Sequence, residues 1–201
     1  MFTGTIREIG VVERVQRREG LVRLAVRGPR TAAKVVAADS VAVSGVCLTA
    51  AAVRAGVMTF EVVPETLRLT TLGRLAPGTR VNLEPSLSLA DRLGGHLVFG
   101  HVDGTGRVVG RQARGGELVL TIQVPAACRG LIVPKGPLAV DGVSLTVGPQ
   151  VTNRLTLHLI PETRRRTTLA ERRVGEWVNL EADYVAKLIR QHLRARHRAA
   201  R

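Results

Sequence analysis

Short runs in which apolar and polar residues alternate dominate the chain, and they predict β-strands rather than long helices. In the first half, these runs fall near residues 1–15, 21–26, 40–44, 47–53, 57–63 and 80–84. In the second half, they fall near residues 97–109, 117–124, 137–140, 143–148, 154–160 and 177–181. Short strands at regular spacing favour a closed barrel or a sandwich.

Three segments break this pattern and predict helices. Residues 64–72 and 161–169 both open with Pro-Glu, which suits a first helical turn, and Gly73 is expected to end the first of them. Asp183 suits a helix N-cap, and the residues after it show helical apolar spacing at Val185, Leu188, Ile189 and Leu193. This apolar stripe is expected either to fold back onto its own barrel or to pack against other subunits.

The two halves of the chain are copies of each other. Residues 43–49 (VSGVCLT) recur as 140–146 (VDGVSLT), 62–66 (VVPET) as 159–163 (LIPET), and 81–84 (VNLE) as 178–181. The offset of about 97 residues is too long for a solenoid repeat and indicates a duplicated domain. We therefore predict one domain over residues 1–96, a second over 97–182 and an oligomerisation helix over 183–201.

The formal net charge of +14 raises the question of nucleic-acid binding. The arginines are dispersed, apart from the run 164–166 and the C-terminal tail, and aromatic residues for base stacking are scarce. No helix-turn-helix, zinc-finger or RNP pattern occurs, so an arginine-rich exterior explains the charge better. The N-terminus does not resemble a signal peptide, and no apolar run is long enough for a membrane span, so a cytoplasmic protein is expected.

The copies differ at the fifth residue of their central motif, which is Cys47 in the first and Ser144 in the second. A thiolate is a strong nucleophile, whereas a buried free cysteine acts only as a small apolar residue. The serine has the alternative role of satisfying the backbone of a turn. Thr49 and Thr146 lie two residues further on, so each is expected on the same strand face as its Cys or Ser.

Other differences concern histidine and cysteine. His101 stands where the first copy has Thr5, which suggests a task such as proton transfer that only one barrel performs; a surface or core histidine is the alternative. His96 is interpreted as part of the junction between the copies. Cys128 has no partner in a C-x-x-C pattern, and the two cysteines lie at non-equivalent places, so neither a disulfide framework nor a metal site is expected.

Several ordered motifs resemble the riboflavin synthase family of the α-chain type. They are residues 1–4 (MFTG), 44–49 (SGVCLT), 94–96 (GGH), 100–102 (GHV), 135–136 (KG), 141–146 (DGVSLT) and both PET blocks. The resemblance covers essentially the whole chain. It implies an all-β fold of two tandem six-stranded antiparallel Greek-key barrels, each with a lumazine site, and a C-terminal helix.

The resemblance also implies a reaction and an assembly. Two molecules of 6,7-dimethyl-8-ribityllumazine would dismutate, by transfer of a four-carbon unit, to riboflavin and 5-amino-6-(D-ribitylamino)uracil, with no cofactor. The implied assembly is a homotrimer in which the first barrel of one subunit faces the second barrel of its neighbour, and an association with lumazine synthase is a further implied partnership. A non-catalytic lumazine- or flavin-binding antenna protein and a basic nucleic-acid-binding barrel are the alternatives.

Carried onto this chain, the resemblance assigns catalysis to Cys47, His101 and Ser144. It assigns substrate binding in the first copy to Gly4, Thr5, Ile6, Ser40, Leu48, Thr49, Glu61, Val62, Val63, Pro64, Glu65 and Thr66. In the second copy it assigns substrate binding to Gly100, Val102, Lys135, Leu145, Thr146, Leu159, Ile160, Pro161, Glu162, Thr163 and Arg164. Glu65 and Glu162 have the alternative role of anions at a helix start, and Thr5 and Pro64 depart from the residues usual in the family.

Overall fold

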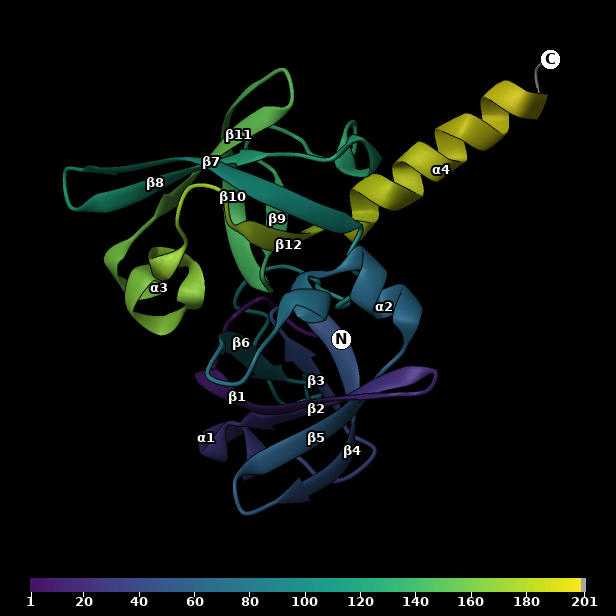
Figure 1. Ribbon diagram of the computed structural model, residues 1–201. Coiled ribbons are helices and arrows are strands. Elements are labelled where there is room, and N and C mark those ends of the chain that lie inside the picture. The colour runs from purple at the N-terminus through teal and green to yellow at the C-terminus, as the bar shows by residue number, and fades with distance from the viewer. Residues whose placement is uncertain (200–201) are drawn as a thin grey trace.

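The computed structural model describes residues 1–199, and side chains throughout this range except at position 114 and positions 197–199. The chain forms two closed six-stranded antiparallel barrels in tandem, followed by one long helix, which confirms the predicted fold class (Figure 1). The first ring runs β1-β2-β5-β4-β3-β6, and the second, read from β7, runs β7-β8-β11-β10-β9-β12. Strands that are distant in sequence are thus neighbours in the same way in both barrels.

The strands of the two barrels correspond one to one, as do α2 and α3, and a 3₁₀ turn (Ala126–Cys128) stands in the second barrel where the first has the short α1. The first barrel contains β1 (Glu8–Arg18), β2 (Leu21–Arg27), α1 (Pro29–Ala32), β3 (Ser40–Val43), β4 (Val46–Arg54), β5 (Val57–Val62), α2 (Pro64–Leu69) and β6 (Arg80–Pro85). The second contains β7 (Gly104–Arg114), β8 (Glu117–Gln123), β9 (Pro137–Val140), β10 (Val143–Val151), β11 (Arg154–Leu159), α3 (Pro161–Arg166) and β12 (Trp177–Ala182). Each barrel closes around its own aliphatic core.

The prediction of strands that begin at residues 1 and 97 was wrong. β1 begins at Glu8 and β7 at Gly104, and the residues before them leave their own barrel. Phe2 and Val98 form an antiparallel bridge between the two copies, with N–H···O distances of 2.7 and 3.0 Å. The apolar pattern is real, but it reflects burial in the other copy: Ile6 packs in the core of the second barrel and Val102 against the core of the first.

The helices after β5 and β11 are shorter than predicted. α2 ends at Leu69, and a separate 3₁₀ turn covers Thr71–Arg74, so Gly73 does not end the helix. Thr70 breaks the helix instead, because its backbone is extended and its side chain accepts a hydrogen bond from the Leu72 N–H at 3.2 Å. Thr167 does the same in the second copy by accepting from the Leu169 N–H.

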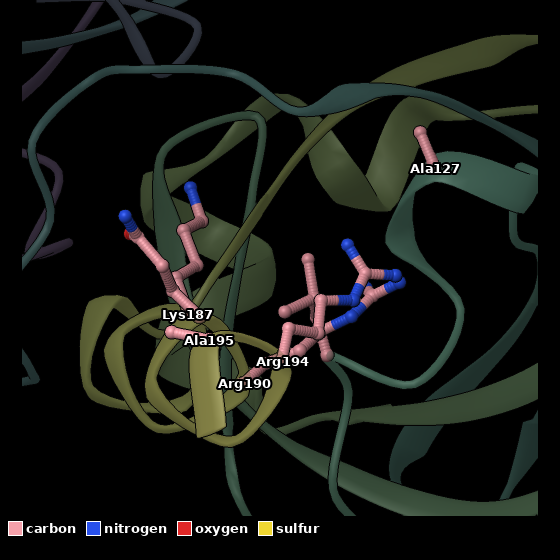
Figure 2. Close-up of a pocket in the computed structure, with 7 residues that line it drawn as sticks. Ala127, Lys187, Arg190, Arg194 and Ala195 are labelled. Carbon is pink, nitrogen blue, oxygen red and sulfur yellow. The ribbon is translucent and has the colours of Figure 1, made fainter. Parts of the chain in front are cut away.

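α4 (Tyr184–Ala199) confirms the predicted C-terminal helix and projects away from both barrels (Figure 1); positions 200 and 201 of that prediction lie outside the described residues. A salt bridge of 2.7 Å from Lys187 to Asp103 and a hydrogen bond from Arg190 to the carbonyl of Arg129 hold its first turns. A cleft of about 580 Å³ lies between α4 and the segment that carries Ala127. Figure 2 shows residues that line it, among them Lys187 and Arg190. The apolar stripe does not fold back, since Val185, Leu188, Ile189 and Leu193 are each about half exposed.

Of the described helices, none is long and apolar enough to cross a membrane.

Candidate functional site between the barrels

The duplicated central motif forms the contact between the two barrels. In each copy the motif is a tight hairpin whose two turn residues have positive φ: Ser44 and Gly45 in the first, Asp141 and Gly142 in the second. The glycines of the two turns meet, because a Cβ added to Gly45 would lie 2.4 Å from the backbone nitrogen of Gly142. Only glycine allows the backbones to approach this closely.

The opening segment of each copy lies against the central motif of the other. The Cys47 N–H donates to the carbonyl of Gly100 at 3.0 Å, and the Ser144 N–H donates to the carbonyl of Gly4 at 2.9 Å. Both glycines have φ near +75°, and a Cβ on either would lie 2.6 Å from the Cβ of the opposing Cys or Ser. The crossing therefore places a predicted substrate-binding glycine directly against Cys47 and another against Ser144.

Buried glutamates hold these crossing segments in place. Glu84 accepts hydrogen bonds from the N–H groups of Thr3 (2.8 Å) and Gly4 (3.1 Å), and Glu181 accepts from those of Phe99 (2.8 Å) and Gly100 (2.9 Å). Burial raises the pKa of both carboxyls, and the N–H donors act in the opposite direction. The recurring VNLE motif signals these residues in the sequence, but its role was missed there because the partners lie about 80 residues away.

The asparagine of the same motif joins the barrels symmetrically. Asn82 donates to the carbonyl of Asp141 at 2.9 Å and accepts from the Thr168 N–H at 2.8 Å. Asn179 donates to the carbonyl of Ser44 and accepts from the Thr71 N–H, both at 2.8 Å. Each amide thus satisfies one donor and one acceptor of the opposite barrel, which fixes the relative orientation of the two barrels.

One buried ion pair breaks the symmetry. Asp141 accepts two hydrogen bonds from the guanidinium of Arg172, at 2.8 and 3.1 Å, and one from the Asn179 N–H at 2.8 Å. The equivalent residues of the first copy are Ser44 and Leu75, which are uncharged. Desolvation raises the pKa of the Asp141 carboxyl, and the guanidinium and the amide counteract it; the pairing in turn raises the pKa of Arg172.

Cys47 lies half-buried at the edge of the contact between the barrels. It packs against a small cluster formed by Phe2, Ala42, Val98 and Ala139, which contains residues of both copies. Cys128 is fully buried in the second core, where desolvation raises the pKa of its thiol to about 12. The two thiols are free, and of the two only Cys47 reaches the surface between the barrels.

Ser144 is paired with a histidine that sequence reasoning had placed in the junction. The Ser144 hydroxyl lies 2.7 Å from Nδ1 of His96. Burial lowers the pKa of His96, and the nearby Asp183 carboxylate acts in the opposite direction. A neutral imidazole can accept the hydroxyl proton or donate its own, depending on the tautomer, so the pair is able to move a proton. The GGH motif was visible in the sequence, but its distance of 48 residues from Ser144 hid this pairing.

His101 does not join this pair. Its ring is exposed and lies 6.1 Å, between centroids, from the ring of Phe99, which in turn contacts Tyr184 of α4 at 4.6 Å. His101 follows Gly100, so the crossing segment carries it to the side of the first barrel, beside Cys47. Of the three predicted catalytic residues, His101 therefore lies on a crossing segment, whereas Cys47 on β4 and Ser144 on β10 each lie against the crossing segment of the opposite copy.

The comparisons with known proteins agree with this architecture. Residues 3–86 and 99–183 each match the family described as the lumazine binding domain. A riboflavin synthase of Mycobacterium tuberculosis (strain ATCC 25618 / H37Rv) is 46% identical over 202 aligned positions, which cover 97% of this chain and 99% of that protein. The riboflavin synthase of Brucella abortus (strain 2308) is 40% identical over 93% of this chain and 95% of its own length.

The chain belongs to the riboflavin synthase family. Among solved structures, LumP in complex with 6,7-dimethyl-8-(1'-D-ribityl) lumazine superposes with a TM-score of 0.82 at 21% identity, over 90% of this chain and 99% of that one. LumP in complex with riboflavin superposes with a TM-score of 0.85 over the same shares of the chains. At this level of identity, the likeness concerns the fold alone.

The two matched lumazine binding domains leave residues 87–98 unmatched between them, and His96 lies in this gap. Within the domains, burial divides several of the predicted substrate-binding residues into two groups. Ile6, Leu48, Val62, Leu145 and Leu159 point into the barrel cores. Thr49, Glu61, Val63, Thr146 and Ile160 are exposed on the outer faces. Thr49 and Cys47 therefore lie on one face of β4, as predicted, and Thr146 and Ser144 on one face of β10.

Exposed apolar residues mark equivalent places in both lumazine binding domains. Val63 and Ile160 are more than half exposed, directly before Pro64 and Pro161 at the first turns of α2 and α3. A single exposed apolar side chain is common on protein surfaces. An exposed apolar side chain at the equivalent place in both copies, however, suits contact with the apolar face of a planar ligand. Thr66 and Thr163 follow on the helices, where their carbonyls accept from Thr70 and Thr167.

The glutamates of the predicted substrate sites already have partners. Glu61 pairs with Arg23 at 2.7 Å, Glu65 with Arg68 at 2.7 Å, and Glu162 with Arg165 and Arg166. Hydrogen bonds from these arginines lower the pKa of Glu65 and Glu162. Both glutamates also lie in a first helical turn, so their role as helix-start anions has direct support.

The remaining predicted ligands lie at the rims of the barrels. Ser40 pairs in register with Thr49 across β3 and β4, and Thr5 donates its N–H to Thr3 at 3.2 Å. Lys135 is exposed on a turn with φ of +64°, at the entry to β9. Arg164 donates to the carbonyl of Gly116 at 2.9 Å, at the tip of the hairpin between β7 and β8.

Proposed function

We propose that this protein is a riboflavin synthase, which converts two molecules of 6,7-dimethyl-8-ribityllumazine into riboflavin and 5-amino-6-(D-ribitylamino)uracil. The observation that carries the proposal is the near full-length match to riboflavin synthases at up to 46% identity, with a lumazine binding domain in each half. The reaction uses two molecules of the same substrate, and this number matches the two similar barrels of the chain. The reaction is a dismutation, because one substrate molecule donates the four carbons that the other accepts.

The residues beside the crossing segments suit the two chemical demands of this reaction. A proton must leave a methyl group of one lumazine, and a nucleophile must add to a ring carbon of the other. Cys47 supplies a half-buried thiol next to the interface, as a nucleophile or as a group that guides one. Ser144 with His96 supplies a hydroxyl whose proton can move, and His101 adds a second imidazole on the segment that crosses to Cys47.

The direct test is turnover of the purified protein with 6,7-dimethyl-8-ribityllumazine as the only substrate. We expect riboflavin to form without added metal, nicotinamide or flavin, and its fluorescence measures the rate. A non-catalytic lumazine-binding protein is the second candidate, because the LumP structures share the fold. Tight binding of the lumazine without any riboflavin would favour that candidate, and turnover only with an added redox cofactor would reject the mechanism.

We further propose that the active unit is a homotrimer in which each site joins the first barrel of one subunit to the second barrel of another. The exposed apolar stripe of α4 supports the assembly, since Val185, Leu188 and Ile189 are each about half exposed and would be buried against a neighbouring subunit. Truncation after Asp183 should therefore weaken both assembly and activity. An unchanged mass by light scattering, together with full turnover, would contradict the role of α4.

Subunit mixing tests the intersubunit site itself. Cys47→Ser and Ser144→Ala each inactivate one barrel, so a mixed trimer contains some interfaces in which both defective residues are absent. We expect activity to recover in part after subunit exchange, as followed by mass spectrometry. If each subunit closed its own site, every site would carry one defect, and exchange without recovery would show this. The proposed association with lumazine synthase is tested separately, by co-sedimentation of the two purified proteins.

A further inference from the structure

An arginine-lined cleft joins the two barrels, and none of the predicted catalytic or substrate-binding residues lines it. Its volume is about 260 Å³, and it is lined by Arg7, Glu8, Ile9, Arg30, Arg165 and Arg166. The first four residues come from the start of β1 and from α1, and the last two come from α3 of the second barrel. The structure thus brings part of the arginine run 164–166, the one cluster inside the domains, against two distant arginines of the other copy.

The carboxylates at the cleft are already engaged. Glu8 is buried and accepts from the Thr31 N–H at 2.7 Å, the Thr31 hydroxyl at 2.8 Å and the Arg30 N–H at 3.2 Å, while the Arg30 guanidinium stays at 3.8 Å. Glu162 forms ion pairs with both Arg165 and Arg166. The four guanidinium groups of the cleft therefore face two carboxylates, which leaves an excess of two positive charges.

The surroundings of Arg7 do not remove this excess. Hydrogen bonds from Ser88 lower the pKa of Asp91, on the linker between the barrels, and the charges of Arg7 and Lys34 lower it further. Its carboxylate accepts the N–H and the hydroxyl of Ser88, at 2.9 and 2.7 Å, and it does not line the cleft. Arg164 turns the other way, to the carbonyl of Gly116, so it takes no part.

We propose that this cleft binds a phosphate dianion, either free or as the terminal group of a small phosphomonoester. The excess of two positive charges matches the charge of the dianion. Guanidinium groups bind phosphate oxygens through paired N–H donors, and this geometry favours arginine over lysine at phosphate sites. Ligand binding also offsets the repulsion among four like charges that the fold brings together.

Because the cleft lies between the barrels, binding of an anion there should affect the contact between them. Arg7 and Arg30 belong to the first barrel, and Arg165 and Arg166 belong to the second, so one bound anion is held by both copies. A ligand that binds only the folded arrangement stabilises it in proportion to its concentration and affinity. Phosphate should therefore stabilise the contact between the barrels, in a way that can be measured independently of turnover.

The test is isothermal titration of the full-length protein with inorganic phosphate at constant ionic strength, balanced with sodium chloride. We expect saturable binding of one phosphate per chain. Removal of Arg7 and Arg166 together, as the variant Arg7→Gln/Arg166→Gln, should weaken the affinity by at least about tenfold, because each charged hydrogen bond contributes strongly. Titration with glycerol phosphate distinguishes the sources: tighter binding than inorganic phosphate identifies a phosphomonoester, and equal binding identifies the free anion.

Arg68 provides a matched control. It is the first-copy equivalent of Arg165 and forms the same type of ion pair, with Glu65 at 2.7 Å, but it does not line the cleft. Arg68→Gln should leave phosphate binding unchanged. Heat that does not saturate, an equal response to chloride, or an equal loss in Arg68→Gln would overturn the proposal. If the double variant does not fold, Arg30→Gln alone replaces it, because that exposed side chain is 75% accessible and contributes little to the core.

Discussion

The two barrels share a backbone frame but differ in the chemistry that the frame carries. The contacts that join them are repeated on both sides: the glycine turns, the crossing segments, the asparagines and the buried glutamates all occur twice. The differences lie at a few positions only. Cys47 becomes Ser144, which is paired with His96, and the Ser44 and Leu75 pair becomes the Asp141 and Arg172 ion pair.

This comparison separates architecture from candidate chemistry. A residue that repeats with the same partner in both copies is explained by the need to hold two equal barrels together. A residue that differs while its backbone environment stays the same needs another explanation. By this criterion, Cys47 and Ser144 with His96 are the strongest candidates for the reaction, whereas Asn82 and Asn179 are structural. The predictions below test this separation.

The largest effect is expected from the buried ion pair. Asp141→Ser leaves the Arg172 guanidinium in the interface without its carboxylate, and the loss of one partner of a buried pair costs about 3–5 kcal/mol of unfolding free energy. The double variant Asp141→Ser/Arg172→Leu installs the residues of the first copy. We expect it to recover at least half of the loss in urea denaturation. If the double variant is as unstable as the single one, the pair is not interchangeable with its counterpart.

The crossing glycines come next. Gly4→Ala and Gly100→Ala each combine a left-handed backbone with a contact of 2.6 Å, so each should lose about 2–4 kcal/mol of stability. Gly20→Ala is the control, because Gly20 has φ of +78° but no atom within 4 Å of an added Cβ, and it should lose only about 1–2 kcal/mol. Equal losses in all three variants would show that the contact with Cys47 and Ser144 contributes nothing.

Cys47→Ser turns the first copy into the second at the position where they differ. It keeps size and hydrogen bonding but removes the thiolate, so we expect turnover to fall by about tenfold to a thousandfold, or about 1.4–4 kcal/mol of barrier, with lumazine binding largely kept. Cys128→Ala is the matched control: it removes the buried thiol and should reduce stability while turnover per folded molecule is unchanged. A serine variant with normal turnover would refute a chemical role for the thiol.

The smallest effect is expected from His96→Gln, with a loss of turnover of about tenfold, or about 1.4 kcal/mol. Burial lowers the pKa of His96, so the folded protein binds fewer protons at this site than the unfolded chain does. At high pH His96 is neutral in both the folded and the unfolded state, so it does not lower the free energy of unfolding. That free energy falls as the pH drops below the pKa of an unfolded histidine, about 6.5. Urea denaturation as a function of pH measures this term, and His96→Gln should remove it.

His158→Gln is the control for this experiment, because His158 is exposed and pairs with Glu117 at 3.1 Å, away from the contact between the barrels. It should leave the turnover unchanged. An equal loss of turnover in both variants would indicate that the effect of His96→Gln does not arise from its pairing with Ser144.

The fold was predictable because its determinants are local. Strand alternation and the glycines at positions 45 and 142 specify hairpins within a few residues, and duplication doubles the signal. The first residues of each copy were misread as strands of their own barrel. The alternation of apolar and polar residues indicates that Phe2 and Ile6 are buried, but it does not indicate which barrel they are buried against. The end of α2 was misplaced at Gly73 because the cap formed by Thr70 depends on an extended backbone at that residue.

The candidate site was predictable only where a residue is unusual in its own segment. Cys47, Ser144 and His101 were singled out because the copies differ there. His96 was undervalued because its partner hydroxyl is far away in the sequence, and Glu84 and Glu181 were noted without a role for the same reason. Their carboxylates are buried, and the backbone N–H groups that satisfy them belong to segments that fold across the molecule. The roles in catalysis and substrate binding stay predictions.

The bridge between Phe2 and Val98 has an evolutionary implication. Its two N–H···O bonds join equivalent segments, as do the meeting of Gly45 with Gly142 and the exchange of Gly4 and Gly100. Such reciprocal contacts are those of two identical chains around a two-fold axis. Before the gene duplicated, the ancestral single barrel would have paired with itself through the same surface. Fusion of the two copies released this surface from exact symmetry, and a cysteine on one side could then persist opposite a serine on the other.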